Sequence, residues 1–355
     1  MLIFSSLTAN GVKLVEISER KQKILAAIVE QYIETGEPVG SKGLVEKLGL
    51  ALSSATIRNE MSELSALGLL EQPHTSAGRI PSHSGYRYYV DNLMNKYELN
   101  APQRRKIEAD MSTGEGDPER LLEKAGEVLA DLTNCAAVST MPKGESVLIK
   151  RIEIVPIGTR TAMIVLLTSG GIIRSRVCRL DFELSGSMIE LFYNLTAAKL
   201  LGCPIRDVNT VMLQTLAASL GIEALAMLPL LATVADLSRD AEETEVMLGG
   251  QSNLLNHREF SGNAHELMDF LNKSEPLNRL ISASKNRLDI MIGKENLYRQ
   301  LENSSIILAR YSVGLKEGGV IGLIGPTRID YARLIPSVRY LTDLVGSLLT
   351  QALEE

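Results

Sequence analysis

The 355-residue sequence contains no tryptophan, and aromatic residues make up only 4% of it. Hydrophobic residues still account for 45% and charged residues for 23%, so the chain can fill globular cores, which must be mainly aliphatic. The three cysteines form no CxxC pair, and the four histidines fit no common zinc spacing. We therefore expect free thiols in a reducing compartment, with neither a metal site nor a cofactor.

Long apolar runs are also missing. The most apolar stretch, about 220–237, is interrupted by Glu223, Pro229 and Asp236 and is too short to span a bilayer. The first ten residues carry no basic residue before their apolar stretch, unlike a secretory signal. We expect a cytoplasmic protein with no membrane partner.

The charge balance is slightly acidic. A total of 37 lysines and arginines against 43 aspartates and glutamates gives a net charge of −6. This balance provides no overall attraction for a phosphate backbone. Any binding of nucleic acid must therefore depend on a local site.

The amino-terminal part predicts three short helices followed by a hairpin. The helices cover about 18–36, 42–48 and 53–67, and two extended pieces around a small-residue turn form the hairpin over 69–82. Prolines in the hairpin indicate an exposed, poorly paired ribbon. This order of elements predicts a winged helix-turn-helix, and a small helical bundle with a hairpin is the alternative.

The third predicted helix has two different faces. Ile57, Met61 and Leu64 lie within about 60° of one another on a helical wheel and must face the core. The opposite side is small and polar enough for a DNA major groove about 12 Å wide, where asparagine can pair with adenine and arginine with guanine or phosphate. The candidate DNA contacts on this helix are Ser53, Ser54, Ala55, Thr56, Arg58, Asn59 and Ser62. A solvated face without a ligand is the alternative.

The hairpin has local basic character. Residues 72–90 contain no acidic residue, whereas Arg79 and Arg87 give this segment a charge of +2. A basic hairpin tip fits contact with phosphates or with a minor groove. We therefore add His74, Arg79 and Arg87 to the candidate DNA contacts, and a short loop that happens to lack acids is the alternative.

The rest of the chain predicts an interrupted sheet. Strands at 146–180 and 304–325 are separated by a helical stretch, which suggests one α+β sheet domain with an insertion. Residues 84–130 should be mainly helical, with a linker at 114–118. A final helix is expected over 331–353.

Long and specific motifs occur near both ends of the chain. They are GEPVGS at 36–41, ATIRN at 55–59, QPHTSAGRIP at 72–81, GYRYYVD at 85–91, IGKEN at 292–296 and IGLIGPTRIDY at 321–331. Together these motifs closely resemble those of the bacterial heat-inducible transcription repressor family HrcA, and the resemblance runs over nearly the whole chain.

The resemblance implies an α+β multidomain protein. Its parts are a winged helix-turn-helix domain, a GAF-like α+β sheet domain and an α/β dimerisation domain inserted into the latter. The expected limits are 1–100 for the winged-helix domain with a linker helix, 101–185 and 263–355 for the two parts of the GAF-like domain, and 186–262 for the insertion.

The resemblance also implies a function. Members repress chaperone operons by binding an inverted repeat in double-stranded DNA, are released on heat stress, and are modulated by the chaperonin GroEL. One winged helix reads only a few base pairs, so a homodimer suits an inverted repeat. The candidate dimer contacts are apolar residues at helical spacing in the insertion, namely Met188, Leu191, Leu195, Leu225, Leu228 and Leu231. Core packing within that domain is the alternative.

Two other functions are the alternatives to this one. An enzyme is not expected, because the glycine-rich stretch 314–325 lacks the phosphate-binding patterns and no nucleophile–base pair stands near it. A metabolite-responsive winged-helix regulator, with the GAF-like domain as its ligand pocket, stays open because no sequence feature excludes it.

Overall fold

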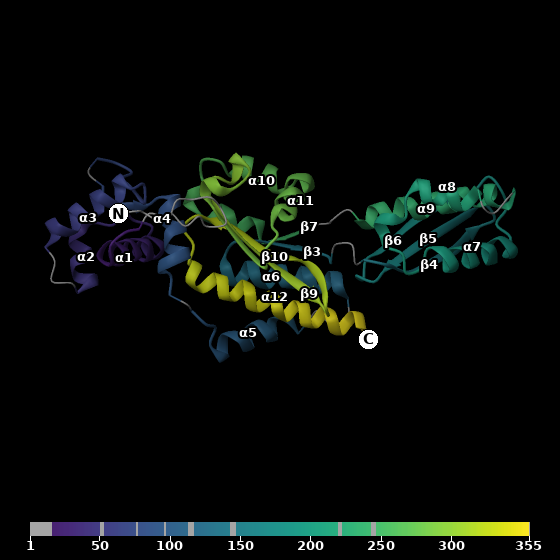
Figure 1. The fold of residues 1–355 in the computed structure, drawn as a ribbon, viewed down its shortest axis with the longest axis horizontal. Helices are drawn as coiled ribbons and strands as arrows, with labels where there is room; N and C mark the ends of the chain where they lie inside the picture. Colours follow the sequence, from purple (N-terminus) through teal and green to yellow (C-terminus); the bar gives the residue numbers. More distant parts are fainter. Residues whose placement is uncertain are drawn as a thin grey trace, which may run out of the picture.

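In the computed structural model, three units follow one another along the longest axis of the molecule (Figure 1). The amino-terminal helices lie at one end, a sheet covered by helices on both faces lies in the middle, and a smaller sheet with its own helices lies at the other end. The structure describes residues 16–49, 53–75, 77–95, 97–112, 117–142, 147–218, 222–242 and 246–354, with the backbone alone at 217–218, 222–226 and 354.

The amino-terminal unit has the order of elements predicted for a winged helix-turn-helix. Its elements are α1 (Glu19–Thr35), α2 (Ser41–Leu48), α3 (Ser54–Ala66), β1 (Leu70–Glu71) and β2 (Ile80–Pro81). The two strands share only two residue pairs, in agreement with the weak ribbon that was expected. An isolated bridge between Val39 and Arg79 ties the wing to the segment before α2.

The core of this unit follows the predicted helix faces. Ile57, Met61 and Leu64 of α3 are buried in one cluster with residues of α1 and α2. The Ser18 hydroxyl caps the start of α1, and Gly36 ends this helix in the left-handed conformation with φ of 70°. The apolar stripe therefore fixes which side of α3 remains outside.

Residues 84–130 are mainly helical, as predicted. The segment contains α4 (His83–Tyr88), a π-helical turn η1 (Tyr89–Leu93), α5 (Ala101–Met111) and α6 (Pro118–Thr133). Asp117 caps α6, and Pro118 occupies its first position, where an amide proton would have no partner within the helix. The first three residues of the expected linker, 114–116, lie outside the described residues.

Five strands form the central sheet, in the order β7-β3-β10-β9-β8, and all neighbouring strands are antiparallel. They are β3 (Ala136–Thr140), β7 (Val246–Gly249), β8 (Leu288–Ile292), β9 (Ser304–Val313) and β10 (Lys316–Pro326). The strands predicted at 304–325 thus form the middle of this sheet.

Alternation along β9 and β10 gives the central sheet two buried faces. Ile307 and Ile321 pack in one cluster with α6 and the carboxyl-terminal helix, whereas Ile306 and Ile324 pack with residues of two shorter helices. The helices are α10 (Ala264–Leu271), α11 (Ser274–Ala283) and α12 (Tyr331–Glu354). Figure 1 shows α6 and α12 on one side of the sheet and α10 and α11 on the other.

A separate sheet has the order β4-β5-β6. Its unit contains β4 (Ile149–Gly158), β5 (Thr161–Thr168), β6 (Ile173–Arg179), α7 (Gly186–Lys199), α8 (Thr210–Ala218) and α9 (Ile222–Glu242). α9 packs against β5 and β6 on the face that carries Ile164 and Cys178, and α7 packs against β4. The short 3-10 turns of the chain are η2 (Ile205–Asp207), η3 (Gln251–Asn256), η4 (Arg258–Phe260), η5 (Gly293–Glu295) and η6 (Arg299–Leu301).

The sheet topology corrects the expected domain limits. The sequence predicts one sheet for the strands at 146–180 and 304–325, but β4, β5 and β6 pair only with one another among the described strands. They join α7, α8 and α9, so the expected boundary at 185/186 cuts through this unit. β7 lies inside the expected insertion 186–262 yet pairs with β3 of the central sheet. A strand pattern reveals which side chains are buried and not which sheet the strand joins.

Candidate nucleic-acid interface

α3 presents a polar face to solvent. The exposed candidates on or next to this helix are Ser53, Ala55, Arg58, Asn59 and Ser62, whereas Ser54 and Thr56 are half-buried. We call Ala55, Arg58, Asn59 and Ser62 the reading face. The side chains of Arg58 and Asn59 form no hydrogen bond or ion pair with other described residues, so both are free to meet a base edge or a phosphate.

The hydroxyl groups in the first turn of α3 already have partners. The Ser53 hydroxyl accepts a hydrogen bond from the Thr56 amide at 3.1 Å, and the Ser54 and Ser41 hydroxyls lie 2.9 Å apart. The first contact caps the helix, and the second ties α3 to α2. These side chains position the reading face, and the strongest free donors on it belong to Arg58 and Asn59.

Two glutamates on α3 would repel DNA phosphates if they were unpaired. The Nζ atom of Lys21 in α1 lies 3.0 Å from Glu60 and 2.8 Å from Glu63. Arg20 adds an ion pair to Glu60 at 3.3 Å. The hydrogen bonds with Glu63 and Glu60 raise the pKa of Lys21, so its charge persists at neutral pH. Sequence reasoning missed this pairing because it examined α3 alone.

The wing is held in place by its backbone. The amides of Val39 and Arg79 each donate to the carbonyl of the other at 2.9 Å. A Cβ atom on Gly78 would lie 2.3 Å from the Val39 carbonyl oxygen, so only glycine permits this close approach. His74 is exposed, and the half-exposed Arg79 side chain has no partner among the described residues. Both predicted wing residues therefore remain available to a ligand.

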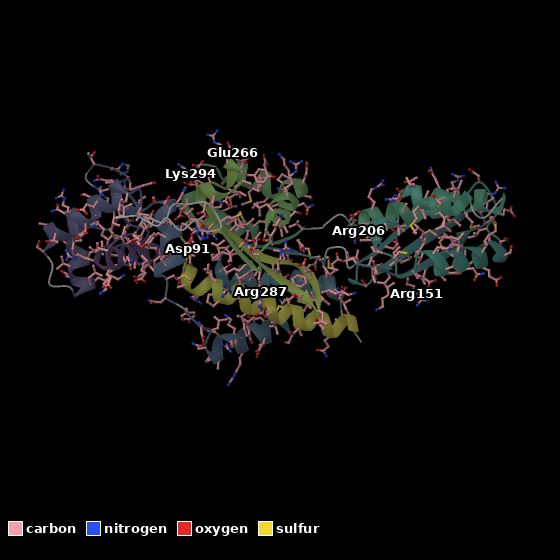
Figure 2. The ribbon with its side chains drawn as sticks, in the orientation of Figure 1. Asp91, Arg151, Arg206, Glu266, Arg287 and Lys294 are labelled. Carbon is pink, nitrogen blue, oxygen red and sulfur yellow. The ribbon has the colours of Figure 1, made fainter. Side chains whose placement is uncertain are left out.

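Arg87 does not belong to this surface. Its side chain is only 13% exposed and forms ion pairs with Glu295 at 2.5 Å and Asp91 at 3.1 Å. It also donates to the carbonyl of Ile290 at 2.6 Å. The prediction that Arg87 contacts DNA is therefore wrong, because two carboxylates already neutralise its charge. Figure 2 labels Asp91 near the junction between the amino-terminal unit and the central sheet.

The predicted dimer contacts fall into two groups. Leu195 and Leu231 are buried in the core of their own protomer, so they cannot form a dimer surface and the prediction is wrong for both. Met188 and Leu191 are half-buried against the same core, and Leu228 is half-buried. The side chain of Leu225 lies outside the described residues. Packing within the unit is what an apolar helical spacing most often reflects.

The same unit exposes apolar side chains on its sheet instead. Val155, Ile157, Ile173 and Val177 are 41–61% exposed. The strand register places Val155, Met163 and Val177 side by side, on the face opposite Ile164 and Cys178. We call this surface the open face, formed by Val155, Ile157, Met163, Val165, Leu167, Ile173 and Val177. Contiguous apolar surface of this kind commonly marks an interface.

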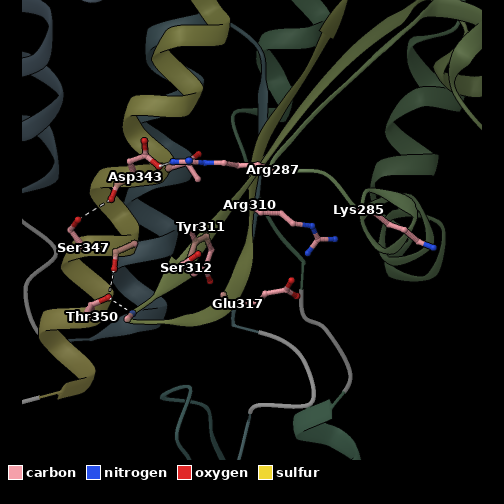
Figure 3. Close-up of a pocket in the computed structure, with 13 residues that line it drawn as sticks. Lys285, Arg287, Arg310, Tyr311, Ser312, Glu317, Asp343, Ser347 and Thr350 are labelled. Atoms are coloured by element: carbon pink, nitrogen blue, oxygen red, sulfur yellow. Dashed lines mark hydrogen bonds and ion pairs between the residues drawn. The ribbon is translucent and has the colours of Figure 1, made fainter. Parts of the chain in front are cut away.

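A cleft of about 820 Å³ opens beside β9, β10 and α12 (Figure 3). Its charged lining residues are Lys285, Arg287, Arg310, Glu317 and Asp343. Arg287 and Asp343 form an ion pair at 2.9 Å, and the Arg310 guanidinium donates to the carbonyl of Ser284. Two of the three cationic side chains, Arg287 and Arg310, thus already interact with other groups of the protein. The cleft therefore offers little positive charge to an anionic ligand.

Within the residues that the structure describes, no group of three or more histidine, cysteine, aspartate or glutamate side chains could hold a metal ion. No helix in this part of the chain is long and apolar enough to cross a bilayer.

Comparison with known proteins decides the family. Residues 16–92 match the family model described as winged helix-turn-helix transcription repressor, HrcA DNA-binding, and residues 119–335 match the HrcA protein C terminal domain. The second match alone spans more than half of the chain. The chain belongs to the HrcA family of heat-inducible transcription repressors. This confirms the resemblance inferred from the motifs.

Individual HrcA proteins are similar over almost the full chain. The heat-inducible transcription repressor HrcA of Acetivibrio thermocellus is 33% identical over 92% of this chain and 94% of its own length. That of Thermoanaerobacter pseudethanolicus is 34% identical over 94% and 97%. A crystal structure of a hypothetical protein has a TM-score of 0.65 and 25% identity, over 95% of this chain and all of that one.

HrcA membership confirms the predicted function in outline. The chain is a DNA-binding transcription repressor of the heat-shock response, and it is not an enzyme. The winged helix that the family model covers is the amino-terminal unit whose geometry is described above. The fold has an amino-terminal winged helix followed by an α+β part with antiparallel sheets.

Proposed function

We propose that this HrcA protein binds an inverted-repeat operator upstream of chaperone genes as a two-fold dimer, with α3 of each protomer in a major groove. The observation that carries the proposal is the reading face, where Arg58 and Asn59 project into solvent without protein partners. Direct readout needs such free donors and acceptors on an exposed helix. Among the other predicted contacts, Ala55 and Ser62 lie beside Arg58 and Asn59 on the reading face. Ser53, Ser54 and Thr56 stabilise the start of α3.

The wing supplies DNA contacts that do not depend on the base sequence. Arg79 and His74 lie on the hairpin that follows α3, and neither is engaged elsewhere among the described residues. A free guanidinium next to a recognition helix reaches a phosphate or a narrow minor groove. Arg79 therefore contributes mainly to affinity, and Asn59 mainly to choice of sequence.

The open face is the dimer surface in this proposal. Val155, Met163 and Val177 form an apolar row across all three strands, and no described element covers it. Arg151 and Glu153 lie beside this row on β4 and form an ion pair with each other within one protomer. The charges next to the apolar row are therefore already neutralised, and a two-fold partner can cover the row without leaving an unpaired charge there. Since the winged helix and this sheet lie at opposite ends of the molecule, the two-fold axis must run along the long axis to bring both α3 helices to one DNA (Figure 1).

The central sheet corresponds to the GAF-like part of the proposal. It has five antiparallel strands with helices on both faces, and β4 to α9 are inserted between β3 and β7. A metabolite-responsive regulator would need a ligand pocket here. The cleft beside α12 gives that alternative little support, because Arg287 and Asp343 neutralise each other across it.

The involvement of GroEL rests on the family resemblance. The open face offers a physical reason for it, because a protomer without its partner would expose apolar side chains of the kind that a chaperonin captures. Heating that separates or opens the dimer would increase this exposure. Unfolded proteins would then compete for the chaperonin, and less repressor would return to its DNA-binding form in the cytoplasm.

A footprint of the purified protein on genomic DNA tests the core of the proposal. We expect protection of an inverted repeat near chaperone genes, with two protected half-sites on one side of the helix. The variants Arg58→Ala and Asn59→Ala should lose this footprint, and Arg120→Ala should keep it because Arg120 is exposed on α6, remote from α3. Protection that survives both α3 variants would overturn the docking proposed here.

A further inference from the structure

Two polar contacts join the winged helix to the central sheet unit. At the first contact, the Glu295 carboxylate receives two hydrogen bonds from Arg87, at 2.8 and 2.5 Å. The amide of Lys294 donates to Nδ1 of His83 at 3.2 Å. Bidentate arginine–carboxylate pairs fix both distance and plane, so this contact is directional.

The turn that carries Glu295 is shaped to receive α4. Gly293 has φ of +60°, and a Cβ atom there would lie 2.4 Å from the His83 ring. A side chain at this position would therefore push the winged helix away. The Glu295 carboxylate also accepts a hydrogen bond from the amide of Ile292 at 2.8 Å, which holds the turn in place.

The second contact lies at the carboxyl end of α1. Arg328 donates to the carbonyl of Ile33 at 2.9 Å and to Glu259 at 2.7 Å. Carbonyls in the last turn of a helix lack partners within the helix and attract cations. Gly36 follows, and a Cβ atom there would lie 3.3 Å from the Arg328 guanidinium. Arg328 thus joins a backbone atom of the winged helix to η4 of the central unit.

Apolar packing lies between these two contacts. Tyr86 of α4 and Tyr331 of α12 are fully buried, and their ring centroids are 5.9 Å apart. Two directional contacts on either side of a packed pair resist both sliding and rotation. Glu295 belongs to the motif IGKEN, and Arg328 and Tyr331 belong to IGLIGPTRIDY, so both carboxyl-terminal motifs meet the winged helix.

We propose that Glu295 and Arg328 are positioning residues for operator recognition. They lock the winged helix on the central sheet and so set the distance between the two α3 helices of the dimer. This inference rests on the dimer described under Proposed function. When both winged helices of a dimer are held rigidly, binding of the first half-site gives the second winged helix a high effective concentration at a half-site of one particular spacing. When the winged helices are loosely held, the dimer binds half-sites of several spacings, but more weakly.

The first experiment measures binding to operators of different spacing. Wild-type protein, Glu295→Gln and Arg328→Met are compared on the native operator, on operators with one to five inserted base pairs, and on a single half-site. Glu295→Gln keeps an oxygen for the Ile292 amide while it removes the charge that pairs with Arg87. Arg279→Met is the matched control, because Glu275 of its own helix α11 is the one ion-pair partner of Arg279 among the described residues.

We expect both variants to bind the native operator at least about tenfold more weakly than wild type and to bind the single half-site within about twofold of it. Their preference for the native spacing should also fall, which a general loss of folding would not produce. Arg279→Met should behave as wild type. Variants that keep the wild-type spacing preference would overturn the proposal.

A second experiment does not depend on DNA or on the dimer. Spin labels at Lys47→Cys on α2 and Glu266→Cys on α10, in a Cys203→Ser background, report the distance between the winged helix and the central unit. Labelled protein is diluted with excess unlabelled protein so that only distances within one protomer count. Glu295→Gln and Arg328→Met should broaden a narrow wild-type distribution. Unchanged widths would refute the lock, while failure of wild type to bind an inverted repeat would refute the proposed function alone.

Discussion

The Nζ atom of Lys21 lies 2.8 Å from the Glu63 carboxylate, so α1 cancels a negative charge that α3 carries beside its reading face. Removal of Lys21 should therefore weaken DNA binding although Lys21 itself need not touch DNA. We expect Lys21→Met to raise the Kd for operator by about three- to tenfold at low salt, and by less at high salt, where charges are screened.

The double variant Lys21→Met/Glu63→Gln is the control for this effect. It removes both charges, so operator affinity should return most of the way to that of wild type. Filter binding or fluorescence anisotropy at two salt concentrations measures both variants. An equally weak double variant would show that Lys21 contacts the operator directly.

Asn59 is expected to select bases. Asn59→Ala should cost about 1–3 kcal/mol per half-site and relax the choice of base at one position of each half-site. A binding selection from randomised operators reads out the second effect. Unchanged selectivity would place base recognition elsewhere on the winged helix.

Arg79 should act on all DNA sequences alike. Arg79→Ala is expected to weaken specific and nonspecific binding by the same factor and to make the salt dependence shallower by about one counterion per protomer. The slope of log Kd against log salt concentration measures this loss. Arg87→Ala should differ, because Arg87 faces Glu295 and its loss affects the position of the winged helix.

The open face gives a test of assembly. A lysine at Val177 would place a charge at the β6 end of the apolar row, and Val177→Lys should yield a monomer by light scattering. Val211→Lys is the control, since Val211 is 71% exposed on α8 of the same unit but lies away from that face. A dimeric Val177→Lys protein would locate the interface elsewhere.

Acid should loosen the contact between α4 and the turn at Lys294. Burial, together with the nearby positive charge of Lys294, lowers the pKa of His83 below 6.5, and these two effects outweigh Glu71, Glu302 and Glu295, which raise the pKa. The unfolded state therefore binds more protons than the folded state. The His83 contribution to stability is complete above about pH 6.5 and is lost as pH falls through the lower, folded-state pKa.

His83→Asn separates this effect from other titrations, because an amide oxygen can still accept from the Lys294 amide but does not titrate. The thermal midpoint of the variant should fall less steeply than that of wild type between about pH 6.5 and 5. Equal slopes would mean that the pKa of His83 is the same in the folded and unfolded states, so that its burial makes no pH-dependent contribution to stability.

The sequence predicted elements whose burial follows a local period. Ile57, Met61 and Leu64 stand at helical spacing, and β9 and β10 contain apolar runs that are buried almost throughout, as expected for strands covered on both faces. It did not single out β7, which has four residues and only half-buried side chains. Short edge strands carry too little pattern to be distinguished from loops.

Relations between distant segments were also beyond the sequence pattern. Arg87 looked like a DNA contact because its neighbours in the sequence carry no acid, yet its partner Glu295 is 208 residues away. Leu195 and Leu231 looked like an exposed apolar set, but they fill the core beneath the small sheet. The local sequence does not show whether a charged side chain or an apolar helix stripe faces solvent or another part of the protein. That depends on the tertiary structure.

The three units stand in a row, with α3 at one end and the open face at the other (Figure 1). Such a row acts as a lever arm. A small tilt between two protomers at the open face is magnified at the winged helices in proportion to the length between them. A slight change in subunit packing on heating would therefore carry both α3 helices out of register with their half-sites while each winged helix stayed folded.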